Sequence, residues 1–480
     1  MARVAGHPPL LRRTTRGASL AAQALLLAAV CVYLGRLASA EAFGMELVAL
    51  LLLAAIALAV AIPPHIFVAL GLVVFGTFSI SDANPLQFGG VQVFSTDVLL
   101  GVVLLRAVLP RERVRPPAAL DGPARLLFAL WAVVMIVAGL RATFSGYELP
   151  SIIRLGIPLI YSVGFYLGFG RIVRERGFEF DKAVRNLLIV ALGFVAYMAF
   201  ARLTNAPFET DQTEGRLGTV VTTGGELRRD YGLASAFILY PALALAGAAY
   251  LLWSPRRTAV AAAAATIGIV ATLLTLIRAE IFGLVAGLAV MALLRSENAL
   301  RRAVRTRAVL AASFAFLVVG LVFWVVSPST ARGVAERSLP GLVDQSRTAE
   351  ATAEVRQNAL AAGFEAARRN PVGVGLVPDE GVTERSGVGL EYLAHSTVTR
   401  ILVYSGWIGF VAAVLALLGV LRASFTMPRP VPWLHPLFVG WVLLLVVYGF
   451  GASGVMGQGW VIGLAALIAA LRFNATGTST

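Results

Sequence analysis

Cysteine and lysine are nearly absent from this chain of 480 residues, which contains only Cys31 and Lys182. A single cysteine cannot form an intrachain disulfide or a cysteine-based metal site. The 40 positive residues are therefore almost all arginine. Charged residues make up 14% of the chain, well below the roughly 25% of an ordinary soluble protein. This scarcity of charge argues against a soluble protein of this length.

Apolar residues make up 58% of the chain and gather in runs long enough to cross a bilayer as helices. The runs lie at about 18–37, 44–62, 65–81, 93–110, 123–140, 152–170, 185–203, 232–253, 258–276, 279–295, 308–327, 396–420, 432–450 and 457–472. The sequence therefore predicts an all-α polytopic membrane protein with about 12–14 transmembrane helices and a large, partly helical extracytoplasmic loop.

The formal net charge of +14 has two readings, a nucleic-acid surface or cytoplasmic loops next to an anionic leaflet. The apolar background argues against nucleic acid as a partner. Most arginines lie in the N-terminal tail and in segments such as 106–125, 171–185 and 295–307, which fall on one side of the predicted membrane domain. Arginine-rich loops face the cytoplasm, so that side is predicted to be cytoplasmic.

This orientation divides the chain into segments. We predict a cytoplasmic tail (1–17), eleven transmembrane helices (18–327) with an outer loop at 204–231, a large extracytoplasmic loop (328–395), three more transmembrane helices (396–472) and a tail (473–480). Within the large loop, residues 348–369 alternate apolar and charged positions at helical spacing and stop at Asn370-Pro371. This pattern predicts an amphipathic helix, and the glycines of "NPVGVGLVP" predict a tight turn after it.

Four basic residues are predicted to meet at the outer membrane face: Arg228 and Arg229 before the helix at 232–253, Arg278 at the start of 279–295, and His395 at the start of 396–420. Charge at membrane depth is costly, so such residues tend to line a polar cavity or hold a partner. A neutral imidazole can accept a proton from a hydroxyl, and guanidinium groups can bind phosphate oxygens.

Each of these residues also has a purely structural reading. Arg278 could form a local ion pair with Glu280, and Arg228 and Arg229 could snorkel to the membrane interface. His395 could simply begin its helix. Asp97, in "FSTDVLL", could cap its helix or serve in a proton relay.

The sequence lacks a GxxxxGK[ST] phosphate loop, an HExxH motif and any cysteine and histidine cluster for zinc. We therefore predict neither a bound metal nor a cofactor.

The segment "HSTVTRILVYSGWIG" fits the pattern His, then Asn, Ser or Gln, nine residues, Gly, two residues, and Gly, Thr or Tyr. His395, Ser396, Gly406 and Gly409 occupy its four positions. It resembles the signature of the bacterial O-antigen ligases and O-antigen polymerases, which are membrane glycosyltransferases of the GT-C type. Ser396, Gly406 and Gly409 are then expected to have structural roles in the motif.

Three further features agree with this resemblance, which covers roughly residues 215–415. The "NPVGVG" turn resembles the one that the family has in the large outer loop before the histidine. Arg278, in "LTLIRAEIFGL", resembles an arginine that opens an earlier span, and Arg229, in "RDYG", best matches a second such arginine.

The resemblance implies transfer of a glycan from undecaprenyl diphosphate to a sugar hydroxyl at the outer face of the bacterial inner (cytoplasmic) membrane. His395 would take the proton of the acceptor hydroxyl, and Arg278, Arg229 and Arg228 would bind the diphosphate. The reaction would be metal-independent and inverting, and membrane lipids would surround the protein. From composition alone, a transporter or flippase for a lipid-linked or anionic substrate is also open, as is a structural membrane protein.

Overall fold

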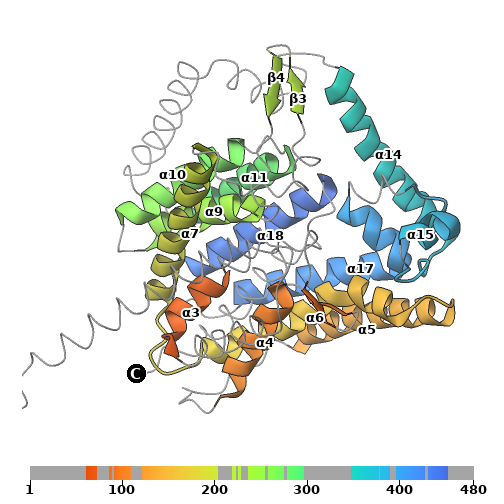
Figure 1. The fold of residues 1–480 in the computed structure, drawn as a ribbon, viewed down its shortest axis with the longest axis horizontal. Coiled ribbons are helices and arrows are strands. Elements are labelled where there is room, and N and C mark those ends of the chain that lie inside the picture. The colour runs from red at the N-terminus through yellow and green to blue at the C-terminus, as the bar shows by residue number, and fades with distance from the viewer. Residues whose placement is uncertain are drawn as a thin grey trace, which may run out of the picture.

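A computed structural model describes a set of ranges that together form one helical body (Figure 1). These ranges are 61–72, 86–88, 91–93, 95–109, 122–203, 219–222, 225–228, 236–254, 258–274, 278–296, 347–377, 379–389, 396–426 and 431–451.

Most of the helices follow the apolar runs of the sequence, and α14 and α15 lie in the polar segment before the run at 396–420. Their bounds are α3 Pro64–Leu70, α4 Ser95–Val108, α5 Gly122–Phe144, α6 Leu149–Ile172, α7 Phe180–Leu203, α9 Ala236–Trp253, α10 Ala259–Leu274, α11 Arg278–Ser296, α14 Arg347–Arg369, α15 Asp379–Ser386, α17 Thr397–Thr426 and α18 Leu434–Gly451. Eight predicted transmembrane helices coincide with α4, α5, α6, α7, α9, α10, α11 and α18 to within a few residues, and a ninth begins with α17.

The remaining predicted helices are described in part or not at all. Those at 18–37, 44–62, 308–327 and 457–472 lie wholly or almost wholly outside the described residues, and the one at 65–81 is described only as far as residue 72. The amphipathic helix predicted at 348–369 is confirmed as α14. It ends at Arg369, immediately before Asn370 and Pro371.

The expectation of a helical chain is confirmed, and two short β-hairpins lie between the helices. Strand β1 (Leu86–Phe88) pairs antiparallel with β2 (Val91–Val93), and β3 (Thr219–Thr222) pairs antiparallel with β4 (Gly225–Arg228). Two residues separate the strands in each case, the spacing of the tightest hairpins. Such short segments carry too little periodicity for the apolar-run reading to detect.

Within the described part of the chain, one helix is long and apolar enough to cross a membrane. It is Thr397–Phe425, which contains a window of 18 residues with a mean hydropathy of 2.3. Several shorter apolar helices accompany it: Leu99–Val108, Ala129–Phe144, Leu239–Trp253, Ala259–Leu273 and Leu434–Gly449.

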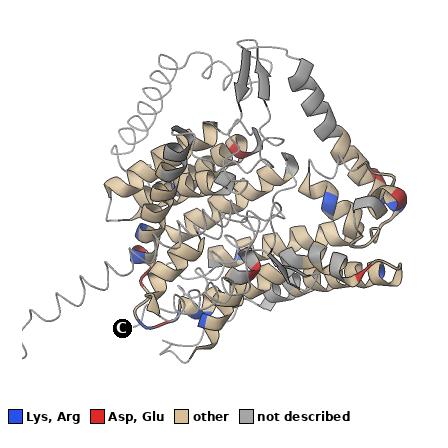
Figure 2. Cartoon of the chain, viewed as in Figure 1, with Lys and Arg blue, Asp and Glu red and all other residues tan. Residues whose placement is uncertain are grey.

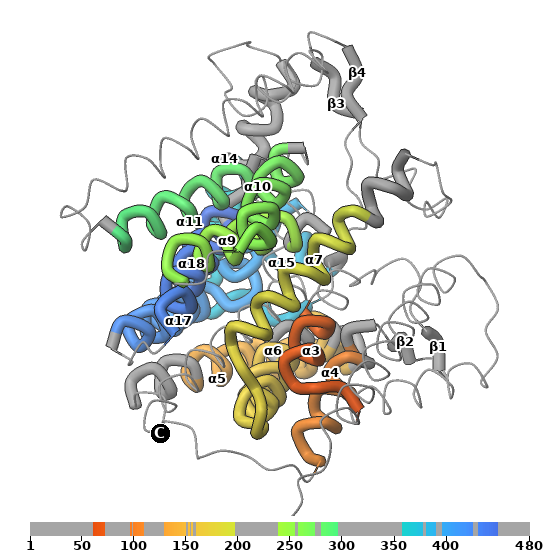
Figure 3. The backbone as a smooth tube through the Cα atoms, turned by 90° about the vertical axis from the view of Figure 1, so that its left-hand side faces the viewer, coloured from red at the N-terminus to blue at the C-terminus, as the bar shows by residue number. Residues whose placement is uncertain are grey.

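The helices form two neighbouring groups (Figures 1 and 3). Helices α7, α9, α10, α11 and α18 share one apolar core, and α3, α4 and α6 share another. Glycines bring backbones together in the first group, because a β-carbon at Gly283 or Gly287 of α11 would press against the backbone of α18. Small residues at helix contacts are typical of packing in membranes.

Charged residues are sparse along the helices and lie mostly toward their ends (Figure 2). One of them is Arg106, in the last turn of α4, whose side chain is fully buried. Its guanidinium donates to both carboxylate oxygens of Glu175, at 3.0 and 2.8 Å, and to the carbonyl oxygen of Ile62 at 2.8 Å. It also lies 4.6 Å from the ring centroid of Phe67. This ion pair ties α3, α4 and the end of α6 together.

Candidate functional site

The candidate site is the junction between α17 and the turn that follows α14. We call residues 370–375 the docked turn, because its backbone pairs with that of α17. The amide of Val374 donates to the carbonyl of Val403 at 2.9 Å, and the amide of Gly375 donates to the carbonyl of Tyr404 at 3.0 Å. The turn closes on itself through Gly373, whose amide donates to Asn370 at 2.8 Å.

The docked turn fits here because α17 is broken at Gly406. This glycine has φ 63° and ψ −161°, a conformation essentially restricted to glycine, and it divides α17 into two helical pieces, 397–405 and 407–426. In an unbroken helix the carbonyls of Val403 and Tyr404 would accept from residues 407 and 408. The docked turn supplies the two missing donors, so the break leaves these carbonyls satisfied.

The fit requires glycine on both partners. A β-carbon on Gly406 would overlap the carbonyl of Pro371, and one on Gly373 would overlap the carbonyl of Tyr404. Gly373 and Gly375 also have positive φ, 75° and 95°. The glycines of the two motifs therefore have a common explanation in one close backbone contact.

Helix α5 holds the docked turn from another side. Arg141 donates from one terminal nitrogen to the carbonyls of Val372 and Gly373, at 2.9 and 2.8 Å. The amide of Leu376 donates to the carbonyl of Ala138 in the same helix at 3.1 Å. Sequence reasoning missed Arg141, although it is an arginine on the side where arginines are predicted to be rare.

Ser396 caps the start of α17. Its hydroxyl oxygen accepts from the amide of Thr399 at 3.2 Å, and its carbonyl accepts from the amide of Arg400 at 3.2 Å. Ser396 is fully buried. A capped start fixes where the helix begins and hence the backbone direction next to His395, which itself lies outside the described residues.

Helix α14 packs directly on this first piece of α17. The hydroxyl of Thr399 donates to the carbonyl of Ala359 at 2.9 Å, and Gly363 lets the two backbones approach closely at Thr399. Just beyond the break, the ring of Trp407 stacks on that of Phe364 in α14, with centroids 5.5 Å apart.

Gly409, the last residue of the motif, lies three residues beyond the break. A β-carbon there would overlap the side chain of Ser405, whose hydroxyl donates to the carbonyl of Ile401 at 2.8 Å. Gly409 thus allows a serine side chain to fold back beside the break.

The predicted arginines begin or end elements. Arg278 is the first residue of α11, and Arg228 is the last residue of β4. Their side chains and the whole of Arg229 lie outside the described part of the structure, so the predicted meeting of these residues with His395 stays a prediction. Glu280, in the first turn of α11, is fully buried. The local ion pair of Arg278 with Glu280 therefore stays open as an alternative.

Asp97 contacts a neighbouring helix. It lies in the first turn of α4 and accepts a hydrogen bond from the hydroxyl of Tyr161 in α6 at 2.6 Å. This contact links α4 to α6.

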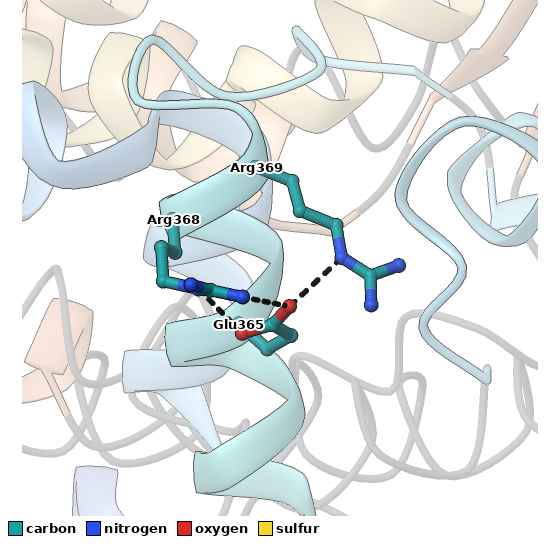
Figure 4. Close-up of polar contacts among 3 residues, drawn as sticks. All are labelled: Glu365, Arg368 and Arg369. Carbon is teal, nitrogen blue, oxygen red and sulfur yellow. Dashed lines mark hydrogen bonds and ion pairs between the residues drawn. The ribbon is translucent and has the colours of Figure 1, made fainter.

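Three charged residues end α14 (Figure 4). Arg368 donates to both carboxylate oxygens of Glu365, at 2.8 and 3.0 Å, and Arg369 donates to one of them at 2.9 Å. The hydrogen bonds from Arg368, and then the one from Arg369, lower the pKa of Glu365 to about 2. Glu365 in turn raises the pKa of Arg368. The cluster therefore carries one net positive charge at neutral pH.

Among the described residues, no three His, Cys, Asp or Glu side chains gather as a metal site would require. No protein-family model matches this chain, and a search of curated proteins finds no relative. The resemblance to the O-antigen ligases therefore depends on the motifs and their placement.

Proposed function

We propose that this chain is a multi-pass glycosyltransferase of a bacterial inner (cytoplasmic) membrane, similar to the O-antigen ligases. It transfers a glycan from undecaprenyl diphosphate to a hydroxyl of a glycan or lipid-linked acceptor at the outer face. The observation that carries the proposal is the contact between the docked turn and Gly406. The two motifs that suggested the family are separate in sequence, yet their backbones pair in the fold.

This pairing explains physically why the motif has its particular spacing. The histidine precedes the Ser396 cap, and the glycine ten residues after that cap is the point where the docked turn inserts. The spacing from Ser396 to Gly406 thus sets the length of the first helical piece, and we infer that this piece positions the catalytic histidine.

Exposed apolar side chains support the membrane location. They run along α5, α6 and the second piece of α17, where water would have to cover them in a soluble protein. On these three segments, the apolar side chains at least 45% exposed are Leu130, Val133, Ile136, Leu140, Phe144, Leu149, Ile153, Ile160, Leu167, Ile408, Val411, Leu418 and Phe425. A bilayer of acyl chains is the medium that fits such a surface.

Contacts on the predicted cytoplasmic side support the orientation. There Glu175 holds Arg106, and Trp433 donates to Asp181 at 3.2 Å. Each contact joins two segments that the arginine pattern had assigned to the same side.

Contacts on the predicted outer side are equally consistent. Arg385, in the large loop, donates to the hydroxyl of Ser145 at 2.7 Å and lies 5.0 Å from the ring centroid of Tyr147. The segment between α5 and α6 therefore meets the large loop, as a single outer face requires.

The chemistry needs few groups. His395 takes the proton of the acceptor hydroxyl as its oxygen attacks the anomeric carbon, and the carrier diphosphate leaves from the opposite side with inversion. Arg278, with Arg229 and Arg228, stabilises the negative charge that develops on the diphosphate. The diphosphate bond supplies the driving force, so the reaction needs no nucleotide.

The test is release of carrier diphosphate from a lipid-linked oligosaccharide by the purified chain in detergent, with and without acceptor. Acceptor-dependent release is expected in the parent and is expected to fall at least about 100-fold in His395→Ala and in Arg278→Ala. His7→Ala, in the N-terminal tail, and Arg185→Ala, an exposed position of α7, are the matched controls and should keep parental rates. Release that survives both site variants would refute the assigned roles.

A transporter or flippase is the second candidate, and the break in α17 is the observation that favours it. Transporters use broken helices whose free backbone groups bind substrate or ions. Here, however, the docked turn already occupies the carbonyls of Val403 and Tyr404. Movement of the lipid-linked sugar across proteoliposomes, without release of carrier diphosphate under any acceptor tried, would replace the transferase proposal with this one.

A further inference from the structure

The charged end of α14 adjoins an exposed aromatic pair. Phe364 and Arg368 are one helical turn apart and so lie on the same side of α14. Trp407 stacks on Phe364, and both rings are partly exposed, at 39% and 38%. From Trp407 the exposed apolar row of α17 continues through Ile408 and Val411. Aromatic rings above an apolar row and next to arginines are typical of a membrane interface.

The arginines keep donors available for a ligand. Arg368 uses Nε and one terminal nitrogen on Glu365, and Arg369 uses only Nε. The other terminal nitrogens bind no group within the described part of the chain, and those of Arg369 extend away from Glu365 (Figure 4). The side chains are 77% and 64% exposed. Because Glu365 fixes both guanidinium groups, less entropy is lost when a phosphate binds to them.

We propose that Arg368 and Arg369 bind the phosphate of an anionic phospholipid headgroup in the outer leaflet, while Phe364 and Trp407 lie among the glycerol and upper acyl region of the same leaflet. The site would anchor the large loop to the membrane surface beside the docked turn. This inference depends on the membrane location proposed above but not on the transfer reaction.

Charge and geometry favour a lipid over a soluble anion. The three-residue cluster has a net charge of +1, which by itself gives only weak attraction to a free phosphate in water. An anionic membrane surface adds roughly a fivefold preference for each nearby positive charge. The adjacent exposed rings would add burial of apolar surface that only a lipid can provide.

Quenching of Trp407 fluorescence tests the proposal. The full chain is placed in phosphatidylcholine nanodiscs that contain either brominated phosphatidylglycerol or brominated phosphatidylcholine, since bromine quenches tryptophan on contact. The Trp407 signal is the difference between the parent and Trp407→Phe. We expect roughly fivefold stronger enrichment of phosphatidylglycerol than of phosphatidylcholine at Trp407.

Substitutions of Arg368 and Arg369 test whether these two residues cause the preference for phosphatidylglycerol. Arg368→Gln with Arg369→Gln should abolish the preference, the double lysine variant should keep most of it, and Arg185→Gln should leave it unchanged. Equal quenching by both lipids in the parent, no quenching at all, or a preference that survives the double glutamine variant would each overturn the proposal.

Carrier-diphosphate release is measured in the same nanodiscs. A lipid preference without release would contradict the transferase alone, and release without a preference would contradict the lipid site alone.

Discussion

The carbonyl oxygen of Pro371 occupies the space that a β-carbon on Gly406 would need. Before the break, the carbonyls of Val403 and Tyr404 accept from the docked turn, and beyond it the amide of Ile408 donates to the carbonyl of Pro371 at 3.5 Å. The broken helix and the turn are therefore one structural unit. A substitution in α17 near the break or in the docked turn should therefore destabilise both.

Gly406→Ala should destabilise this unit strongly. The alanine would have to adopt a glycine-only conformation, which costs about 1–3 kcal/mol, and would also collide with the docked turn, so we expect a loss of about 3 kcal/mol or more in the free energy of unfolding. SDS titration in mixed micelles measures it. The control is Gly101→Ala in α4, where an added β-carbon meets nothing within 4 Å, and which should be neutral or slightly stabilising. Equal effects in both variants would contradict the assigned role of the break.

Arg141→Gln should loosen the docked turn without unfolding the bundle. It removes two charge-assisted hydrogen bonds to backbone carbonyls, so we expect a loss of about 1–2 kcal/mol. Hydrogen exchange at Val374 and Gly375 should rise more than exchange in α9. Because Arg141 and Gly406 act on the same turn, the double variant should cost less than the sum of the single ones. Strict additivity would show that Arg141 has no influence on the break.

Long apolar runs made most of the helices predictable, since a bilayer-length run has few alternatives to a helix. Helix α14 was equally predictable from its alternating charges and its stop at Asn370-Pro371. The break in α17 was not, because a glycine inside an apolar run looks like any other until the turn that fills it is known. The motif marks Gly406 as a structural position, but nothing in it distinguishes a helix break from the unbroken helix around Gly101.

The polar contacts were the least predictable part, because their partners are distant in sequence. Arg106 resembled any arginine at the cytoplasmic end of a span, yet it is buried against a residue 69 positions away. Arg141 binds a carbonyl 231 positions away. The motif located the candidate site, but only the folded backbone explains its glycines.

Ser396→Ala should shorten or fray the start of α17. Loss of an N-cap costs about 1 kcal/mol, and the contacts of α14 and of the docked turn with the first piece of the helix should keep the rest of that piece folded. Ser396→Asn keeps a capping side chain and should retain both stability and, under the proposed function, release of carrier diphosphate. A parental rate in the alanine variant together with a lost rate in the asparagine variant would rule out a capping role.

The Glu365 carboxylate should titrate far below its usual range. Its folded pKa of about 2 lies below the ordinary value of 4.5, so the contact with Arg368 and Arg369 stabilises the end of α14 fully above about pH 4.5 and is lost as the pH falls toward 2. Carboxyl ¹³C shifts, assigned with Glu365→Gln, give the midpoint. Arg368→Gln removes the larger cause of the shift and should raise the midpoint. A midpoint near 4.5 in the parent would mean that the contact does not form in solution.

Arg106→Met should destabilise the fold more than any other single change to a charged residue discussed above. A second substitution, Glu175→Met, should restore most of the lost stability. Removing the arginine leaves Glu175 buried without its cation, which costs about 3–5 kcal/mol. Replacing both residues by methionine removes the buried charges together, so the double variant should recover most of that loss. SDS titration of both variants gives the comparison. If the double variant were as unstable as Arg106→Met, the guanidinium would act mainly through Ile62 and Phe67, and the ion pair would not be what holds α3, α4 and the end of α6 together.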